Sequence, residues 1–489
     1  MKYIKKLRTA TVFGLMCLML SSCTDWLTVD PEDQILEDQA FSTETNVQIT
    51  FNGLYLKMAE EDLYGFQLTS GAVDVLGQYY NIPGSASSRW WYVLKEYTAT
   101  DNAYKERFEK IWKAAYNLIL DINLFLDMLD RTDDAVIIDS HRNILKGEAY
   151  AMRAYVHLDM LRLFGPVYSR NPEGLAIPYY RKAAPLVQQR LTAEEAITEI
   201  LLDLDEAIKY LDKDPVRTDG VMVDEPGGND VYKGDFYTYR NRRLNYYAVQ
   251  ALKARALMWK GDKTAAAELA AKLLVATEVP EKFPWITVEE LNHMNLPDRI
   301  FSMETLFGIH SYNMYEYYIE YFQAGILQES QLLAASRTNV NYWFNVSDYN
   351  TSNDYRARRF NAYKDPAYVR TDKFAPIITS LHTDVLFFQP LIRKTELYYI
   401  LAEANGDLKY LDEVRKNRGL LTFGEMGTSP AVNTEVAREH MLEFMGEGQL
   451  FYYYKRMYMT RIRLGTTGGN LTMDDSKYVV PLPQKELNQ

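Results

Sequence analysis

Two stretches of this chain combine aromatic rings with amide and charged side chains. The first contains Gln78-Tyr79-Tyr80-Asn81, a Gly- and Ser-rich run, and then Arg89-Trp90-Trp91-Tyr92. A sugar ring presents an apolar C–H face and a rim of hydroxyls, so a glycan site needs a Trp or Tyr platform beside amide or charged groups. The Gly/Ser run indicates a loop, from which neighbouring rings can reach solvent. We predict that Tyr80, Asn81, Arg89 and Trp90 bind a ligand; the alternative is that Trp90 and Trp91 are both buried.

The second stretch runs from His310 to Asn345. Tyr residues at 312, 315, 318 and 321 recur every three positions. This spacing places them roughly along one helix face, which is more typical of a core than of a binding site. Further on, amide side chains bracket two rings. We predict that this group also binds the ligand: Asn341, Tyr342, Trp343 and Asn345.

Residues for catalysis form no recognisable motif. The six His are scattered without an H-x-x-x-H or Cys/His pair, and neither a G-x-S-x-G elbow nor a phosphate-binding Gly loop is present. Carboxylates are numerous enough to supply a glycosidase acid/base pair. Most of them, however, lie on predicted helix faces beside Lys or Arg, where a solvated surface is expected. We predict no catalytic residue.

Three aspartates, Asp348, Asp354 and Asp365, have the oxygen ligands that a calcium ion prefers. Their spacing does not match a calcium loop such as D-x-D-x-D-G. We therefore expect no cofactor and no metal site.

The N-terminus has the pattern of a bacterial lipoprotein signal. Four basic residues precede position 9, an apolar run covers residues 12–20, and Leu20-Ser21-Ser22-Cys23 follows. The apolar run is too short to span a bilayer of about 30 Å. We predict a signal peptide over residues 1–22, lipidation of Cys23, and a polar tether over residues 23–45. The alternatives are an ordinary signal peptide with an incidental Cys, or a buried helix.

The composition narrows the possible partners. Loss of residues 1–22 removes four basic residues and no acidic one, so the formal charge changes from −12 to −16. Such an acidic chain repels phosphate backbones, and we expect no nucleic-acid partner. The 38 Tyr, 20 Phe and 7 Trp suit surfaces that bind polar, ring-bearing ligands, although wet helix interfaces account for most of the Tyr.

Amphipathic helices must position these candidate residues. Apolar side chains keep the 3.6-residue period over residues 108–129, a second helix is expected over 141–164, and a capping box at Thr192 opens a third that continues through Leu211. Helical hairpins turn at Gly261-Asp262 and at Gly406-Asp407 and are similar to tetratricopeptide repeats. Residues 283–390 are predicted to be mostly irregular, and an insert of this length is usually functional.

Several segments, in this order and spacing, resemble the SusD/RagB family of Bacteroidetes nutrient-uptake outer-membrane lipoproteins. The similarity covers nearly the whole chain behind the lipoprotein signal. The segments that carry it are Asp25-Trp26-Leu27, Asn52-Gly53-Leu54-Tyr55, Glu148 to Gly165, Leu244 to Asp262, Arg393 to Leu420, and Val480-Pro481-Leu482-Pro483-Gln484.

The chain departs from the family pattern in two places. Near the C-terminus the family commonly reads E-R-x-x-E-x-x-x-E-G-x-R-x-x-D, whereas here Gln449-Leu450 follows Glu447-Gly448 without the usual Arg, and Tyr453 replaces the usual Asp. Gly165-Pro166-Val167-Tyr168 also replaces the usual G-D-V-P. We interpret both departures as changes in local packing and not as a change of fold.

The resemblance implies a fold of the all-α (mainly α) class. It would have about four tetratricopeptide-like helix pairs and a loop-rich ligand-binding lobe. The body would cover residues 46–489, with the helices chiefly in 46–275 and 391–420 and the lobe chiefly in 276–390. It also implies a protein that is not an enzyme. Such a protein lies as a lid on a SusC-type TonB-dependent β-barrel transporter and delivers a glycan to it.

The residues themselves leave other functions open. One alternative is a peptide-binding member of the same family. A second is a lipid-anchored glycosidase, and a third is a helical-repeat scaffold that binds only proteins. We predict a glycan-binding lipoprotein, anchored by lipid to the outer membrane and exposed at the cell surface.

Overall fold

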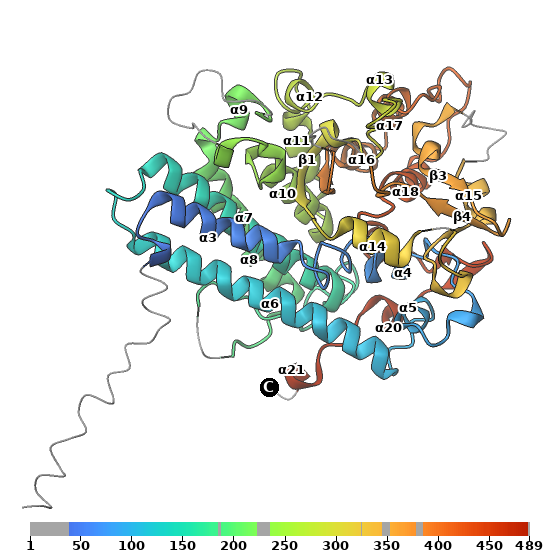
Figure 1. Cartoon of the computed structure of the whole chain (residues 1–489), viewed down its shortest axis with the longest axis horizontal. Helices are drawn as coiled ribbons and strands as arrows, with labels where there is room; N and C mark the ends of the chain where they lie inside the picture. Colours follow the sequence, from blue (N-terminus) through green and yellow to red (C-terminus); the bar gives the residue numbers. More distant parts are fainter. Residues whose placement is uncertain are drawn as a thin grey trace, which may run out of the picture.

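Long helices pack side by side in one half of the protein (Figure 1). In this computed structural model the described residues are 39–183, 187–222, 235–323, 325–344, 353–377 and 385–487. The long helices are α3 (Glu44–Met58), α6 (Asn102–Arg131), α7 (Asp139–Phe164) and α8 (Ala193–Tyr210). The signal segment, Cys23, most of the tether and Asn345 lie outside the described residues.

The sequence patterns for these helices are confirmed. Helix α6 includes the whole predicted span of 108–129, and its apolar stripe is buried. Helix α8 begins after Thr192, whose side chain accepts from the Glu195 amide while Glu195 accepts from the Thr192 amide. This reciprocal pair satisfies two amides that the first turn of a helix leaves without partners.

Helix α7 is buried on nearly every side between α6 and α8. Its polar side chains are therefore paired inside the protein. Arg153 donates to Asp203 of α8 at 2.7 Å, and Glu148 accepts from Arg240 at 2.7 Å. All four of these side chains are buried, and a buried charge is tolerated only when it is paired and hydrogen-bonded. This explains why the most family-like segment of the chain has charges at core positions.

Both predicted helical hairpins are present. Helices α10 (Tyr246–Lys260) and α11 (Lys263–Leu273) turn at Gly261, and α16 (Lys394–Asn405) and α17 (Lys409–Lys416) turn at Gly406. Both glycines have a left-handed backbone, with φ of 87° and 64°. Glycine adopts this conformation without steric cost and commonly ends a helix in this way. The mainly helical class is thereby confirmed.

Shorter elements occupy the other half of the chain. Within the described residues, three small antiparallel sheets form: β1 (Thr305–His310) with β5 (Phe388–Arg393), β4 (Tyr368–Thr371) between β2 (Ala335–Ser336) and β3 (Phe360–Ala362), and β6 (Arg461–Arg463) with β7 (Asn470–Thr472). The first sheet joins residues 305–310 to the start of α16, so the segment between them returns to the helical body.

The remaining helices are short or lie near the C-terminus. They are α4 (Ala72–Leu76), α5 (Trp90–Lys95), α9 (Val216–Asp219), α12 (Val279–Lys282), α13 (Val288–Leu291), α14 (Met314–Tyr321), α15 (Arg337–Phe344), α18 (Val432–Glu443), α19 (Leu450–Arg456), α20 (Asp475–Tyr478) and α21 (Gln484–Leu487). Among the described residues, no helix combines the length and apolarity that crossing a membrane requires.

A buried ionic network fastens the sheets and short helices to α18. Glu443 is fully buried and accepts from Arg393 at 2.5 Å, from Arg418 at 2.6 Å and from Arg356 at 3.1 Å. Glu439 accepts from Arg356 at 2.6 Å, and Glu447 accepts from Arg393 at 2.9 Å. The three acids belong to the C-terminal motif that is similar to the family pattern. The network shows that the acids of this motif hold the fold together.

Candidate functional site

The first predicted stretch contains the start of a short helix. Helix α5 begins at Trp90, with Arg89 as its exposed N-terminal flanking residue. Trp90 is half-buried, whereas Trp91 is 3% exposed and packs edge-on against Tyr321. Consecutive residues of a helix point about 100° apart, so one of two adjacent tryptophans faces the core and the other the surface.

Two half-buried rings, Trp90 and Tyr317, contact Phe66. Its ring centroid is 6.5 Å from that of Trp90 and 5.3 Å from that of Tyr317 on α14. Tyr321 stacks on Phe66 at 4.4 Å and fills the space beneath. We call the surface formed by Trp90 and Tyr317 the aromatic patch. Phe66 and Tyr321 keep its two rings in place.

Charged groups border the aromatic patch. The Arg107 guanidinium lies 4.5 Å from the centre of the Trp90 ring and donates to Asp62 at 3.2 Å. Glu61 lies 3.7 Å from Arg107. Burial raises the pKa of Tyr317, so its hydroxyl stays protonated and is able to donate to a ligand oxygen. The patch therefore offers rings, carboxylate acceptors and donors within one surface.

Two residues of the first stretch lie beneath the surface. Tyr80 is 2% exposed, and its hydroxyl donates to the Ser70 carbonyl at 2.7 Å. Asn81 is half-buried, and its backbone N–H donates to the Ala334 carbonyl at 2.7 Å. In this structure both residues hold the loop in place. Their direct contact with a ligand stays a prediction.

The amide-bracketed rings of the second predicted stretch lie on α15. Tyr342 is 56% exposed, with the Arg463 guanidinium 3.8 Å from its ring centre, and Asn341 is also exposed. Trp343 is 3% exposed and packs on Tyr79. Tyr342 is thus the accessible ring of this group, and the predicted ligand contact of Trp343 stays a prediction. Asn345 lies outside the described residues.

The structure brings the two stretches together below the surface. The ring centroids of Tyr79 and Trp343 are 5.8 Å apart. Both stretches also bind the same segment, because Gln78 accepts from the Gly465 amide at 3.2 Å and Asn339 donates to the Gly465 carbonyl at 2.9 Å. The exposed members, Trp90 and Tyr342, belong to α5 and α15, which lie in the same half of the protein (Figure 1).

Sequence reasoning missed several residues that border the accessible rings. Tyr317 lies within the second stretch but off its three-residue spacing, and Arg107, Glu61 and Arg463 carry no signal in the sequence. These residues come from α14, from α6, from the turns after α3 and from β6, so only packing places them beside Trp90 or Tyr342. No local spacing in the sequence marks such a neighbour.

A third aromatic group lies at the end of β1. Tyr315 and Phe387 have ring centroids 4.4 Å apart, and His310 lies 5.5 Å from Phe387. Tyr312 is 48% exposed. Burial and the neighbouring Arg242 lower the pKa of His310, so the imidazole is neutral at pH 7. This group places the exposed ring of Tyr312 at the start of the second stretch.

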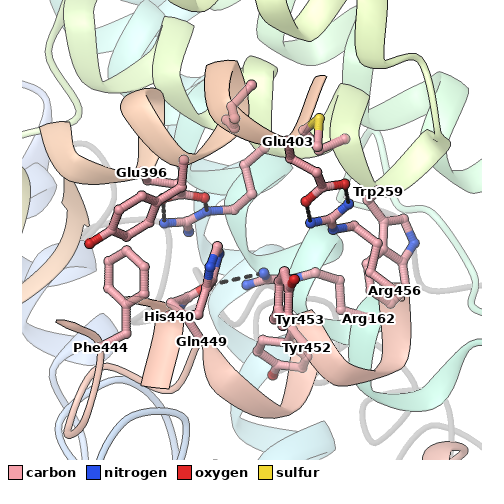
Figure 2. A pocket seen from close by; sticks show the side chains of 14 residues that line it. Arg162, Trp259, Glu396, Glu403, His440, Phe444, Gln449, Tyr452, Tyr453 and Arg456 are labelled. Atoms are coloured by element: carbon pink, nitrogen blue, oxygen red, sulfur yellow. Dashed lines mark hydrogen bonds and ion pairs between the residues drawn. The ribbon is translucent and has the colours of Figure 1, made fainter. Parts of the chain in front are cut away.

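The pocket in Figure 2 has a different character. It measures about 40 Å³ and lies between α10, α16, α18 and α19. Its charges are paired with each other: Arg255 donates to Glu396 at 2.7 Å, and Arg456 donates to Glu403 at 2.6 Å. A space of this size holds ordered water but not a sugar ring. The pocket is therefore a small polar cavity between helices of the body.

Two residues of the C-terminal motif, Gln449 and Tyr453, line this pocket. Gln449 accepts from Arg162 at 3.1 Å, and Tyr453 stacks on His440 with centroids 4.1 Å apart (Figure 2). Burial lowers the pKa of His440 to about 4, which keeps the stacked imidazole neutral at pH 7.

Glu403 is expected to make the protein acid-sensitive. Although burial alone opposes its charged form, Arg456 holds the pKa of Glu403 at about 2, below the usual 4.5. A lowered carboxyl pKa stabilises the fold above pH 4.5, and this contribution is lost as the pH falls toward 2. We expect about 3 kcal/mol from this group in urea unfolding. In Glu403→Gln the unfolding midpoint should change less over this pH range; an unchanged pH profile would refute the assignment.

The described residues contain no group of three or more His, Cys, Asp or Glu side chains arranged to hold a metal ion. Asp354 accepts from Arg356 at 2.8 Å in the ionic network. Asp365 accepts from the Ala367 amide at 2.8 Å, and Asp348 lies outside the described residues.

Part of the chain matches a model of a known protein family. The SusD-like_3 family model, described as starch-binding and associating with the outer membrane, matches residues 25–219. No curated protein sequence matches the chain significantly.

Solved structures share the fold over most of the chain. A SusD superfamily protein from Bacteroides thetaiotaomicron has a TM-score of 0.69 at 18% identity, covering 91% of this chain and 98% of its own. A SusD-like carbohydrate binding protein from Bacteroides vulgatus has a TM-score of 0.67 at 16% identity, covering 91% and 96%. A laminarin binding SusD-like protein has a TM-score of 0.59 at 16% identity, covering 91% and 97%. The chain is thus similar to SusD-like proteins: its residues 25–219 match their family model, and it shares their fold over most of its length.

Proposed function

We propose that this protein binds a glycan at the aromatic patch. The observation that carries the proposal is the pair of half-exposed rings, Trp90 and Tyr317, bordered by Arg107, Asp62 and Glu61. Stacking on the rings would bury the C–H face of a sugar, while the carboxylates accept from its hydroxyls. The description of the family as starch-binding and the laminarin binding relative support this class of ligand.

The proposal extends to the place of action. Residues 1–22 would direct export, Cys23 would carry the lipid, and residues 23–45 would tether the body to the outer surface of the outer membrane. The partner would be a SusC-type TonB-dependent β-barrel transporter, to which the protein delivers its glycan. The family description, which associates such proteins with the outer membrane, supports this placement.

In this proposal the protein binds and does not cleave. The carboxylates beside the patch, Asp62 and Glu61, both lie within 4 Å of Arg107. Paired in this way, they serve as fixed acceptors for hydroxyl groups.

A glycan-array screen with the chain from Thr24 onward tests the proposal. We expect binding to one class of polysaccharide and no release of shorter sugars from it during prolonged incubation. Turnover of the bound polysaccharide would establish a glycosidase instead. Silence across the array together with binding of peptides would identify a peptide receptor.

The transporter and the anchor need separate tests. We expect the full-length protein to be digested by protease added to intact cells, and to co-purify with a TonB-dependent barrel in mild detergent. A Cys23→Ala variant should lose its membrane attachment. Protection of the wild-type protein from the external protease would place it on the periplasmic side.

A further inference from the structure

A cavity of about 200 Å³ opens on the helical body, away from the aromatic patch. It lies between α6, the segment around 178–182 and α21, which Figure 1 shows below α6 near the C-terminus. Three rings line it. The centroids of Trp112 and Tyr116 are 4.4 Å apart, and those of Tyr116 and Tyr180 are 5.7 Å apart. The cavity thus has an aromatic floor.

The walls are held by hydrogen bonds. Tyr116 Oη donates to the Pro178 carbonyl at 3.1 Å, and Asn123 Nδ2 donates to the Tyr180 carbonyl at 3.0 Å. The Tyr180 amide donates to His157 Nε2 at 3.2 Å, and burial lowers the pKa of His157 to about 3, so the imidazole stays a neutral acceptor. The cavity is therefore pre-formed, and a ligand would not have to order its walls.

Polar groups at the rim remain available to a ligand. Asn117 and Lys182 are exposed, and neither makes a hydrogen bond or ion pair within the described residues. Glu486 of α21 also lines the cavity and is half-buried. One ammonium and one carboxylate give the rim no net charge. This arrangement suits a neutral ligand that both donates and accepts hydrogen bonds.

We propose that this cavity is a second saccharide site, which takes a single neutral sugar ring. The aromatic floor would bury the C–H face of the ring, while Asn117, Lys182 and Glu486 bind its hydroxyls. The volume lies below the range of about 300–1,000 Å³ for drug-sized ligands, so it admits one ring and not a chain. The site is separate from the aromatic patch, because Arg107 lies roughly half a turn around α6 from the lining residues.

Fluorine NMR of the full-length protein labelled with 5-fluorotryptophan tests this site. The probes are methyl α- and methyl β-D-glucopyranoside at millimolar concentration, in a detergent without a sugar headgroup. We expect one or both to shift the Trp112 signal, which a Trp112→Phe variant assigns. Asn117→Ala should weaken this response about tenfold, the loss of one or two hydrogen bonds. Lys113→Ala, at an exposed neighbouring position that does not line the cavity, should leave the response unchanged.

Binding at this cavity is tested separately from binding at the aromatic patch. Trp90→Ala should abolish responses at the patch and leave the Trp112 shift intact, so failure of one site does not obscure the other. If neither glucoside moves the Trp112 signal, or if Asn117→Ala responds like the wild type, the second site is refuted.

Discussion

Trp90→Ala is expected to weaken glycan binding about 30-fold, equivalent to about 2 kcal/mol. Trp90 is the larger ring of the aromatic patch, and its exposed face is the stacking surface available to a sugar. Its loss would also remove the ring that lies 4.5 Å from the Arg107 guanidinium. Isothermal titration with the polysaccharide identified on the array would measure the change in affinity.

Tyr342→Ala is the matched comparison for Trp90→Ala. Tyr342 is an exposed ring beside Arg463, on α15, so its removal should leave folding intact. If Tyr342→Ala removes binding and Trp90→Ala does not, the platform lies on α15 and the proposed site moves there. Trp343→Ala is unsuitable for this purpose. Trp343 is 3% exposed, and truncation of a buried Trp costs about 3–5 kcal/mol of stability.

Glu443→Gln is expected to lower the free energy of unfolding by about 3–5 kcal/mol. The substitution preserves the shape of the side chain and removes its charge. Arg393 and Arg418 would then lie in the core without their shared carboxylate, from which they are now 2.5 and 2.6 Å away. Urea unfolding at neutral pH, followed by circular dichroism, should show a clearly lower midpoint.

A surface Glu→Gln change serves as the control for Glu443→Gln. Glu206 lies on α8, half exposed and 3.5 Å from Lys209. Exposed ion pairs contribute at most about 1 kcal/mol, so Glu206→Gln should keep the wild-type midpoint. Equal midpoints for Glu443→Gln and the wild type would show that the network is not needed for stability.

The sequence predicted the parts of the fold that depend on neighbours along the chain. The apolar period of α6, the capping box at Thr192 and the glycine turns at Gly261 and Gly406 are all local signals, and each appears in the structure as expected. The three small sheets were not predicted, because their strands are two to six residues long and pair across distant segments.

The ionic network was only partly visible in the sequence. Glu439, Glu443 and Glu447 match the acidic positions of the family pattern, but their partners come from the 3-10 turn Tyr355–Arg359, from β5 and from the turn after α17. Spacing along one segment says nothing about which arginine, tens of residues away, will meet a given acid. The pairing is a result of burial, since each charge must find its opposite inside the core.

The sequence by itself determined the mainly helical body of this protein and the two stretches in which aromatic residues are grouped with amides. Only the tertiary structure decided which of those rings reaches solvent. Trp90 and Trp91 are adjacent in the chain, yet one borders the surface and the other meets Tyr321. Exposure depends on how α5, α6 and α14 pack around Phe66, and such long-range packing leaves no local pattern in the sequence.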